Sequence, residues 1–459
     1  MAGIGFELKK IYGRKTLAAN LWGTVYSTMT TIGPAVLSAV LMLVLKILLD
    51  QAGLTVLEER FYISATVYAF VVSTLSAVIF AAPVSRYISD CIFLDRERDI
   101  CPSAFGVLAL STAVSGVVML VICIGLYIFS GDQVSLTFLI SYYFLGVLIT
   151  DVYSMMTYAS ALKHYRALTV SFGIGFLLAL GVYLLCYGWL HMPKVTAACI
   201  GLVFCYSVIL FALVFQCVKT FGMPNGRYFD FLVYFRRYPR LAVAGFAYTL
   251  GIYSPTLIYW FLSESAEKVS IFLTFPSFDI SLFLAVVVNM PSLVIFVVKV
   301  ETSFYEKYTL YVSALNNGTH NMIQKERETM SRTLRHQLFF VYDIQLIITV
   351  VLVCLVSVFF PYLSASAQML GFFVMLSLGV YAVFCMYFTI VVFYYFSDYG
   401  SACISALCFL VVTTLSALIC AHFNILFPLP LLLGGLCGWV VAFLLLRSRM
   451  KKLDSFLMC

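Results

Sequence analysis

Charged side chains are scarce in this sequence: Asp, Glu, Lys and Arg make up 11% of its 459 residues, whereas hydrophobic residues make up 63%. The mean hydropathy is +1.02. A water-soluble protein cannot bury this much apolar surface, so lipid must solvate most of the chain. The composition excludes a soluble protein and predicts an integral membrane protein.

The sequence also lacks the motifs of common enzyme chemistry. It has no Gly-rich phosphate loop with a lysine, no Gly-x-Ser-x-Gly elbow, and no acidic cluster suited to Mg²⁺ and a nucleotide sugar. Its 14 cysteines stand singly, mostly in apolar runs, and its 5 histidines are dispersed. This pattern favours small buried hydrophobes over disulfides or a zinc site. We expect no enzyme activity, no cofactor, no metal and no nucleic-acid partner.

Long apolar runs are abundant instead. A helix needs about 20 apolar residues to cross the hydrocarbon core. Twelve segments qualify: 22–48, 61–88, 104–130, 135–160, 168–190, 195–218, 241–262, 269–298, 338–362, 367–396, 401–423 and 429–446. We therefore predict an all-α membrane protein with about twelve transmembrane helices.

Basic residues are distributed unevenly between the predicted loops. If the N-terminus is cytoplasmic, all of the 28 Lys and Arg residues lie on the cytoplasmic side except four, which are Lys46, Arg60, Lys194 and Lys268. Cytoplasmic loops of membrane proteins carry such an excess of Lys and Arg. The bias supports twelve spans and predicts that both termini are cytoplasmic.

The spans divide into two halves of similar length. We predict a cytoplasmic interfacial amphipathic N-terminus at 1–20, a six-helix bundle at 21–218, a cytoplasmic linker at 219–240, a second six-helix bundle at 241–446, and a basic cytoplasmic tail at 447–459. Six plus six spans are typical of parallel repeats related by an axis along the membrane normal.

Acidic residues inside the predicted spans need a reason, because a charge at the centre of a membrane helix costs about 2.5–3.5 kcal/mol on insertion scales. Asp151 shares one helical face with Ser154 and Tyr158. Asp279 follows Pro276, with Asn289 further along the same predicted span. One interpretation is a polar path that meets a hydroxylated substrate or a proton. The other is that each acid pairs with a neighbouring helix and holds the bundle together.

Tyrosine is abundant, with 30 residues, and Tyr153, Tyr248 and Tyr253 fall well inside predicted spans. Aromatic rings can stack on sugar rings while phenols hydrogen-bond to sugar hydroxyls, which suits a carbohydrate path. Helix packing with an internally bonded hydroxyl is the alternative for each of them.

The cytoplasmic segment 299–337 has apolar residues at helical spacing on either side of an Asn317-Gly318 break. We predict two amphipathic helices against the inner leaflet or a cytoplasmic partner. The residues that we expect to dock a partner are Tyr305, Tyr308, Lys325, Arg327 and Arg332.

Four stretches of the chain stand out together. They are the opening MAGIGFELKK, the Gly33-Pro34 pair, RYISD at Arg86–Asp90, and a stretch that contains Asp279, Phe283, Leu284, Ala285, Pro291, Glu301, Thr302, Phe304 and Tyr305. In this combination they resemble the PelG family of inner-membrane exopolysaccharide exporters. The similarity runs in patches over nearly the whole chain. One departure is YTLGIYSPTLIYW, which lacks the acid and the lysine that the family pattern leads us to expect there.

This resemblance implies a MATE-like fold of the multidrug/oligosaccharidyl-lipid/polysaccharide flippase superfamily, with two bundles around a central cavity. It also implies a cytoplasmic glycosyltransferase that makes a hexosamine-containing polymer, and a cyclic di-GMP-binding membrane component as partners. We expect export of a nascent polysaccharide to the periplasm. The alternatives are a lipid-linked oligosaccharide flippase, a cation-coupled multidrug exporter, or a membrane scaffold that recruits a glycosyltransferase without transport.

Overall fold

The computed structural model describes residues 41, 44–45, 47–49, 51, 53–130, 134–162, 165–223, 226–296, 302–359 and 366–451. Within them, 11 helices are long and apolar enough to cross a membrane. This finding confirms an all-α, multi-pass membrane protein. Most of the predicted span 22–48, the predicted N-terminal segment 1–20 and the tail beyond Lys451 lie outside the described residues, and the cytoplasmic placement of the termini stays a prediction.

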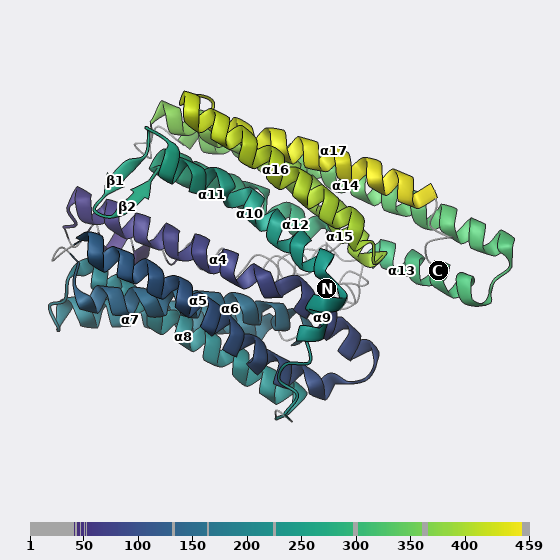
Figure 1. Cartoon of the computed structure of the whole chain (residues 1–459), viewed down its shortest axis with the longest axis horizontal. Helices are drawn as coiled ribbons and strands as arrows, with labels where there is room; N and C mark the ends of the chain where they lie inside the picture. Colours follow the sequence, from purple (N-terminus) through teal and green to yellow (C-terminus); the bar gives the residue numbers. More distant parts are fainter. Residues whose placement is uncertain are drawn as a thin grey trace. The chain divides into compact units, whose positions relative to one another are not determined.

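One compact unit, the first unit, comprises the described residues of Gly33–Pro276. Its elements are α4 (Val56–Phe93), the 3₁₀ turn η1 (Glu97–Asp99), α5 (Ile100–Ser130), α6 (Leu136–Leu162), α7 (Tyr165–Gly188), α8 (Lys194–Phe221), α9 (Leu232–Arg237), α10 (Pro239–Leu262), β1 (Glu267–Val269) and β2 (Phe272–Thr274). The antiparallel pair β1–β2 lies at the end of this unit opposite α9 (Figure 1).

The second unit comprises the described residues of Ser277–Cys459. It contains α11 (Pro276–Asn289), α12 (Pro291–Phe296), α13 (Thr302–Asn317), α14 (His320–Phe359), α15 (Ala367–Tyr395), α16 (Tyr399–Phe423) and α17 (Leu429–Lys451). The first residue of α11, Pro276, still belongs to the first unit. The division into compact units at residue 276 differs from the predicted division at the linker, because α10 packs on α4. The predicted pair of six-helix bundles stays a prediction.

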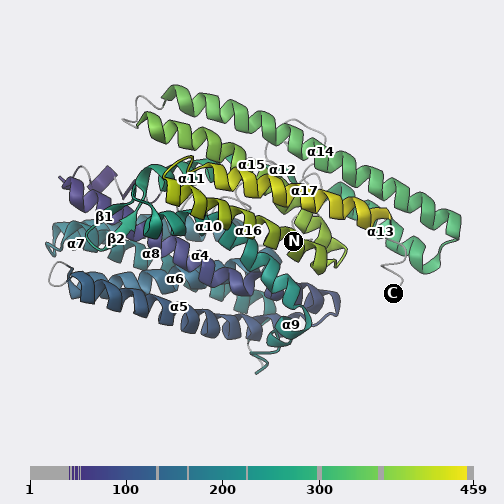
Figure 2. The same ribbon diagram turned by 45° about the horizontal axis from the view of Figure 1, so that its top comes forward.

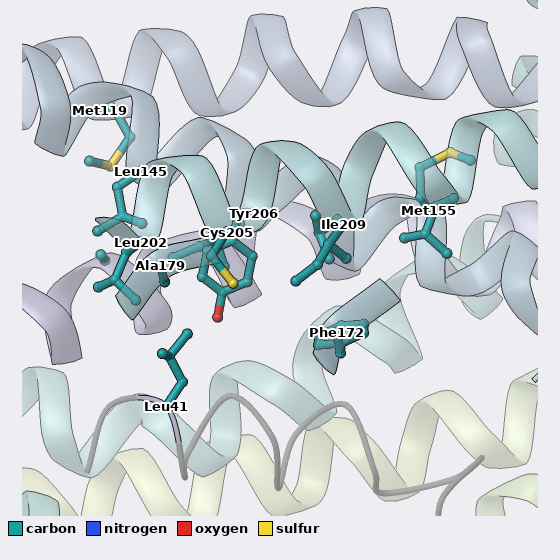
Figure 3. Packing of buried hydrophobic residues seen from close by; sticks show 14 of the residues in the cluster. Leu41, Met119, Leu145, Met155, Phe172, Ala179, Leu202, Cys205, Tyr206 and Ile209 are labelled. Atoms are coloured by element: carbon teal, nitrogen blue, oxygen red, sulfur yellow. The ribbon is translucent and has the colours of Figure 1, made fainter. Parts of the chain in front are cut away.

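Local sequence sets where helices begin and how closely they pack. Thr55 and Glu58 form a capping box at the start of α4: the Thr55 hydroxyl accepts a bond from the Glu58 amide at 3.3 Å, and the Glu58 carboxylate accepts one from the Thr55 amide at 2.9 Å. In the core of the first unit, α8 packs against α6 and α7 through apolar side chains such as Leu202 and Ile209 (Figure 3). Small residues let membrane helices approach in this way, and a Cβ at Gly201 would lie 2.8 Å from the Ala179 carbonyl oxygen.

The predicted span at 269–298 is confirmed as a membrane span at Pro276–Phe296, but its predicted start is too early. Residues 267–274 form the β1–β2 hairpin, the helix begins at Pro276, and it is interrupted at Met290 between α11 and α12. Proline suits the first position of a helix and disfavours helical geometry in the residue before it. Pro276 and Pro291 therefore mark the start of each helix.

The prediction of two amphipathic helices in 299–337 is partly confirmed. The first of these helices, α13, ends at Asn317, where the sequence predicts a break. The second amphipathic stretch is not a separate helix, because it continues into the next membrane span as the single 40-residue helix α14. Figures 1 and 2 show α14 extending past the end of α17. At 1.5 Å per residue, α14 is about 60 Å long, about twice the thickness of the hydrocarbon core.

Candidate functional site

Aromatic side chains from four helices of the first unit gather around Tyr153 on α6. The Phe70 ring on α4 lies 6.3 Å from the Tyr153 ring and 6.2 Å from the Tyr206 ring on α8. Tyr253 on α10 is a further neighbour of Tyr153, and it faces Thr74 on α4. Tyr206 is buried, whereas Phe70, Tyr153 and Tyr253 are only half-buried. These four rings, the aromatic group, bring together two of the four predicted path tyrosines, Tyr153 and Tyr253.

Asp151 links α6 to α5. Its carboxylate accepts hydrogen bonds from the Ser111 hydroxyl at 2.5 Å and the Thr112 hydroxyl at 2.7 Å, and the residue is 5% exposed. Both carboxylate oxygens therefore have donors within the helix packing. This geometry matches the alternative in which the acid joins neighbouring helices, and the role of Asp151 in a path stays a prediction.

The rest of the predicted face on α6 is also buried. The Tyr158 hydroxyl lies 3.1 Å from that of Ser103 on α5. The Ser154 hydroxyl is buried and has no hydrogen-bond partner within the part of the chain that the structure describes. Tyr248 is half-buried on α10. Of the predicted path residues in this unit, the half-buried ones are therefore tyrosines.

Substitutions at Asp151 separate charge from helix packing. We expect Asp151→Asn to retain export, because an amide oxygen still accepts a hydroxyl bond, and Asp151→Ala to lower the free energy of unfolding by about 1–2 kcal/mol. Thermal unfolding of the purified variants and polymer secretion measure the two effects. Ser154→Ala is the matched control and should be neutral. Loss of export in Asp151→Asn at unchanged stability would instead place this carboxylate in the transport path.

Asn289 is the centre of a second buried cluster, in the second unit. Its Oδ1 accepts hydrogen bonds from Gln345 Nε2 at 3.1 Å and the Thr349 hydroxyl at 2.9 Å. Its Nδ2 donates to the Ala285 carbonyl at 2.9 Å and the Ser377 carbonyl at 3.1 Å. This Asn289 cluster joins α11, α14 and α15, so Asn289 also lies within helix packing.

Asp279 lies in the first turn of α11 rather than in the middle of a span, and it is half-buried. An acidic side chain is favourable at a helix N-terminus because it offsets the positive end of the helix dipole. Because the helix starts later than predicted, Asp279 lies at a helix N-terminus rather than deep within a membrane span. Asp279 belongs to the second unit and Asp151 to the first.

The linker between α8 and α10 is bound to the end of α4. The Tyr234 hydroxyl donates to Asp90 Oδ2 at 3.0 Å, and Arg86 pairs with Asp90 Oδ1 at 3.2 Å. The rings of Tyr87 and Tyr234 meet edge to face at 5.3 Å. Burial and then the bond to Asp90 raise the pKa of Tyr234 to about 12. The hydrogen bond from Tyr234 to Asp90 therefore contributes its full stabilisation below about pH 10, and this stabilisation is lost as the pH rises through about 12.

The same linker lies against the start of α5. A Cβ at Gly106 would overlap the Tyr228 carbonyl and would lie 3.1 Å from the Phe231 ring. Phe231 is 0% exposed, and Arg227 pairs with Asp99 at 3.4 Å. Only glycine allows the backbone of the linker to come this close to α5.

The residues predicted to dock a partner lie on α13 and α14. Lys325 and Arg332 are exposed, and Arg327 is half-buried. The Tyr308 ring packs 5.9 Å from the ring of Phe396, which is also in the second unit. The side chain of Tyr305 lies outside the described residues.

Sequence analysis did not identify the residues that form hydrogen bonds with Asp151 and Asn289. Ser111, Thr112, Gln345 and Thr349 are ordinary polar residues in apolar runs, and only the fold places them beside Asp151 and Asn289. Among the residues that the structure describes, no group of three or more His, Cys, Asp or Glu side chains could hold a metal ion.

Comparison with known families gives a match over residues 1–457 to the family described as "PelG: Putative exopolysaccharide Exporter (EPS-E)". A comparison with curated proteins gives no match.

Solved MATE transporters share this fold. An outward-facing multidrug resistance MATE transporter of the MOP superfamily superposes with a TM-score of 0.63 at 14% identity, over 94% of this chain and 96% of that one. A MOP superfamily transporter from Pyrococcus furiosus gives 0.62 at 13% identity, over 94% and 96%. An inward-facing MATE transporter gives 0.55 at 12% identity, over 91% and 99%. These likenesses confirm the predicted MATE-like fold.

Proposed function

The chain belongs to the PelG family, and we propose that it exports a nascent, hexosamine-containing exopolysaccharide from the cytoplasm across the bacterial inner membrane. The observation that carries this proposal is the family match over residues 1–457. The membrane helices and the MATE-like fold support a membrane transporter.

The aromatic group supports a carbohydrate as the substrate. Tyr153, Tyr253 and Phe70 are half-buried, so part of each ring remains available for contact, and the two phenols add hydrogen-bonding hydroxyls. Tyr248 is half-buried on the same helix as Tyr253. Asp151, Ser154 and Tyr158 complete the proposed path in the first unit as residues that shape it, and Asp279 and Asn289 are the proposed path residues of the second unit.

The cytoplasmic partner in this proposal is a glycosyltransferase that elongates the polymer, together with a cyclic di-GMP-binding membrane component. The docking surface is the exposed face of α13 together with that of the first half of α14. Lys325 and Arg332 lie in this half of α14. A helix of about 60 Å reaches well beyond the hydrocarbon core, so these residues would stand clear of the membrane.

Charge reversal tests this docking surface. We expect Lys325→Glu with Arg332→Glu to weaken binding of the purified glycosyltransferase at least about tenfold, because charge at an exposed rim governs the encounter of two proteins. Titration by biolayer interferometry at two salt concentrations measures the change. Arg447→Glu, at an exposed arginine of α17, is the matched control. Equal binding by the double variant and the control would contradict docking at this face.

Complementation of a strain that lacks this chain tests the function. We expect the wild-type chain to restore secreted polymer without changing tolerance to cationic dyes. A multidrug exporter would change dye tolerance, and a lipid-linked oligosaccharide flippase would move a short lipid-attached product rather than polymer. A scaffold would keep secretion when Tyr153 and Tyr253 are replaced together by Ala, whereas the proposed exporter should lose most of it. Retained secretion by this double variant would overturn the proposed path.

A further inference from the structure

Helix α10 is tied to α4 near the end that carries the β1–β2 hairpin. The Tyr68 ring on α4 stacks on Trp260 with centroids 4.0 Å apart and planes 9° apart. The Tyr68 hydroxyl also donates to the Leu273 carbonyl in β2 at 2.7 Å. Arg60 adds an exposed pair with Glu267 in β1 at 2.6 Å. The hairpin and the last turns of α10 are therefore bound to one helix, α4.

The two helices remain in contact along their middle. A Cβ at Gly245 would lie 3.4 Å from the Cβ of Ala82, which is ordinary van der Waals contact. Tyr253 faces Thr74 on α4. The backbones can approach closely here because both facing residues are small.

The opposite end of α10 is held by the RYISD segment, Arg86–Asp90. Asp90 accepts the hydrogen bond from Tyr234 in the linker. The Arg86 guanidinium lies 5.9 Å from the ring centre of Tyr238, which directly precedes α10. A cation over an aromatic face is attractive at this distance. Within the same segment, Ser89 is exposed, and among the described residues its hydroxyl bonds only to the Ser85 carbonyl of its own helix, at 2.9 Å.

We propose that RYISD is the anchor of the linker, and that this anchor keeps α10 with the first unit throughout the transport cycle. The linker then keeps a fixed position on the end of α4 and is not a flexible connection. The chain passes from the first unit to the second at Pro276–Ser277, after the hairpin. This assigns a role to a motif whose position alone does not reveal one.

Amide hydrogen exchange of Leu232–Arg237 in the intact chain tests the anchor without reference to transport. We expect Tyr234→Phe and Asp90→Ala each to speed exchange of α9 about tenfold or more, the usual effect of losing a hydrogen bond to a charged group. The double variant should match Asp90→Ala, because without Asp90 the Tyr234 hydroxyl has no hydrogen bond to this residue left to lose. Ser89→Ala should leave exchange unchanged, and unchanged exchange in α17 shows that each variant is folded. Wild-type exchange in both single variants, or fully additive effects, would overturn the anchor.

A disulfide between α4 and α10 tests whether they move together, and this arm rests on the proposed function. Cysteines at Ala82 and Gly245 (Ala82→Cys with Gly245→Cys) place their Cβ atoms at about the separation that a disulfide needs. We expect the bond to form, as measured by mass spectrometry, and the oxidised protein to export polymer as the reduced one does. Loss of export on oxidation, but not in Ala82→Cys alone, or failure of the bond to form, would overturn joint movement. If the wild-type chain exports nothing, the proposed function fails while the exchange experiment still decides the anchor.

Discussion

Gly106→Ala should release the linker from α5 and abolish most polymer export. The new methyl group would overlap the Tyr228 carbonyl, which is backbone and has no rotamer to change. Overpacking of this kind costs about 1–3 kcal/mol. Since α5 is held by its membrane neighbours, we expect the linker to yield, with faster amide exchange in Leu232–Arg237 and lower secretion.

Gly125→Ala is the matched control in the same helix. A Cβ at Gly125 would meet no atom of the described part of the chain within 4 Å, and alanine favours a helix over glycine by up to about 1 kcal/mol. This variant should be as stable as the wild type or more so, and should export normally. Equal behaviour of the two variants would show that the close approach at Gly106 does not constrain the linker.

Asn289→Leu should give the largest loss of stability in the second unit. It removes four hydrogen bonds and leaves the Gln345 amide and the Ser377 carbonyl without this partner in an apolar interior. Hydrogen bonds between membrane helices average about 0.6 kcal/mol each, so we expect a loss of about 2 kcal/mol. Thermal unfolding of the purified protein measures it.

Ser377→Ala is the control for this cluster. Its hydroxyl donates to the Phe373 carbonyl of the same helix, at 2.7 Å. Its backbone carbonyl, which accepts the bond from Asn289, is retained in this variant. We expect a change of at most about 0.5 kcal/mol. If Asn289→Leu is no worse than this control, the cluster does not hold the three helices together.

Hydropathy predicted the membrane helices well because one physical requirement, crossing the hydrocarbon core, sets their length. The break after Asn317 was also predictable from local residue types. The β1–β2 hairpin was missed because residues 269–275 are mostly apolar and merge with the following helix in a hydropathy window. Local pattern separates a short buried strand from a helix poorly.

The candidate site was harder to predict, because its contacts join distant parts of the chain. Asp90 and Tyr234 are 144 residues apart, and Asn289 is 56 residues from Gln345. An acid or amide in an apolar run signals that a partner exists but does not say which residue it is. Sequence analysis therefore singled out Asp151 and Asn289 as polar residues in apolar runs, while their hydrogen-bond partners required the fold.

The unbroken course of α14 has a mechanical consequence. Two separate helices joined by a turn would absorb a displacement at the turn, whereas a single α-helix transmits rotation and tilt along its length. The proposed docking face at Lys325 and the Asn289 cluster at Gln345 lie on the same helix, 20 residues or about 30 Å apart. A partner that turns the exposed half of α14 must also turn Gln345 and Thr349 against Asn289, so events outside the membrane reach its interior through one helix.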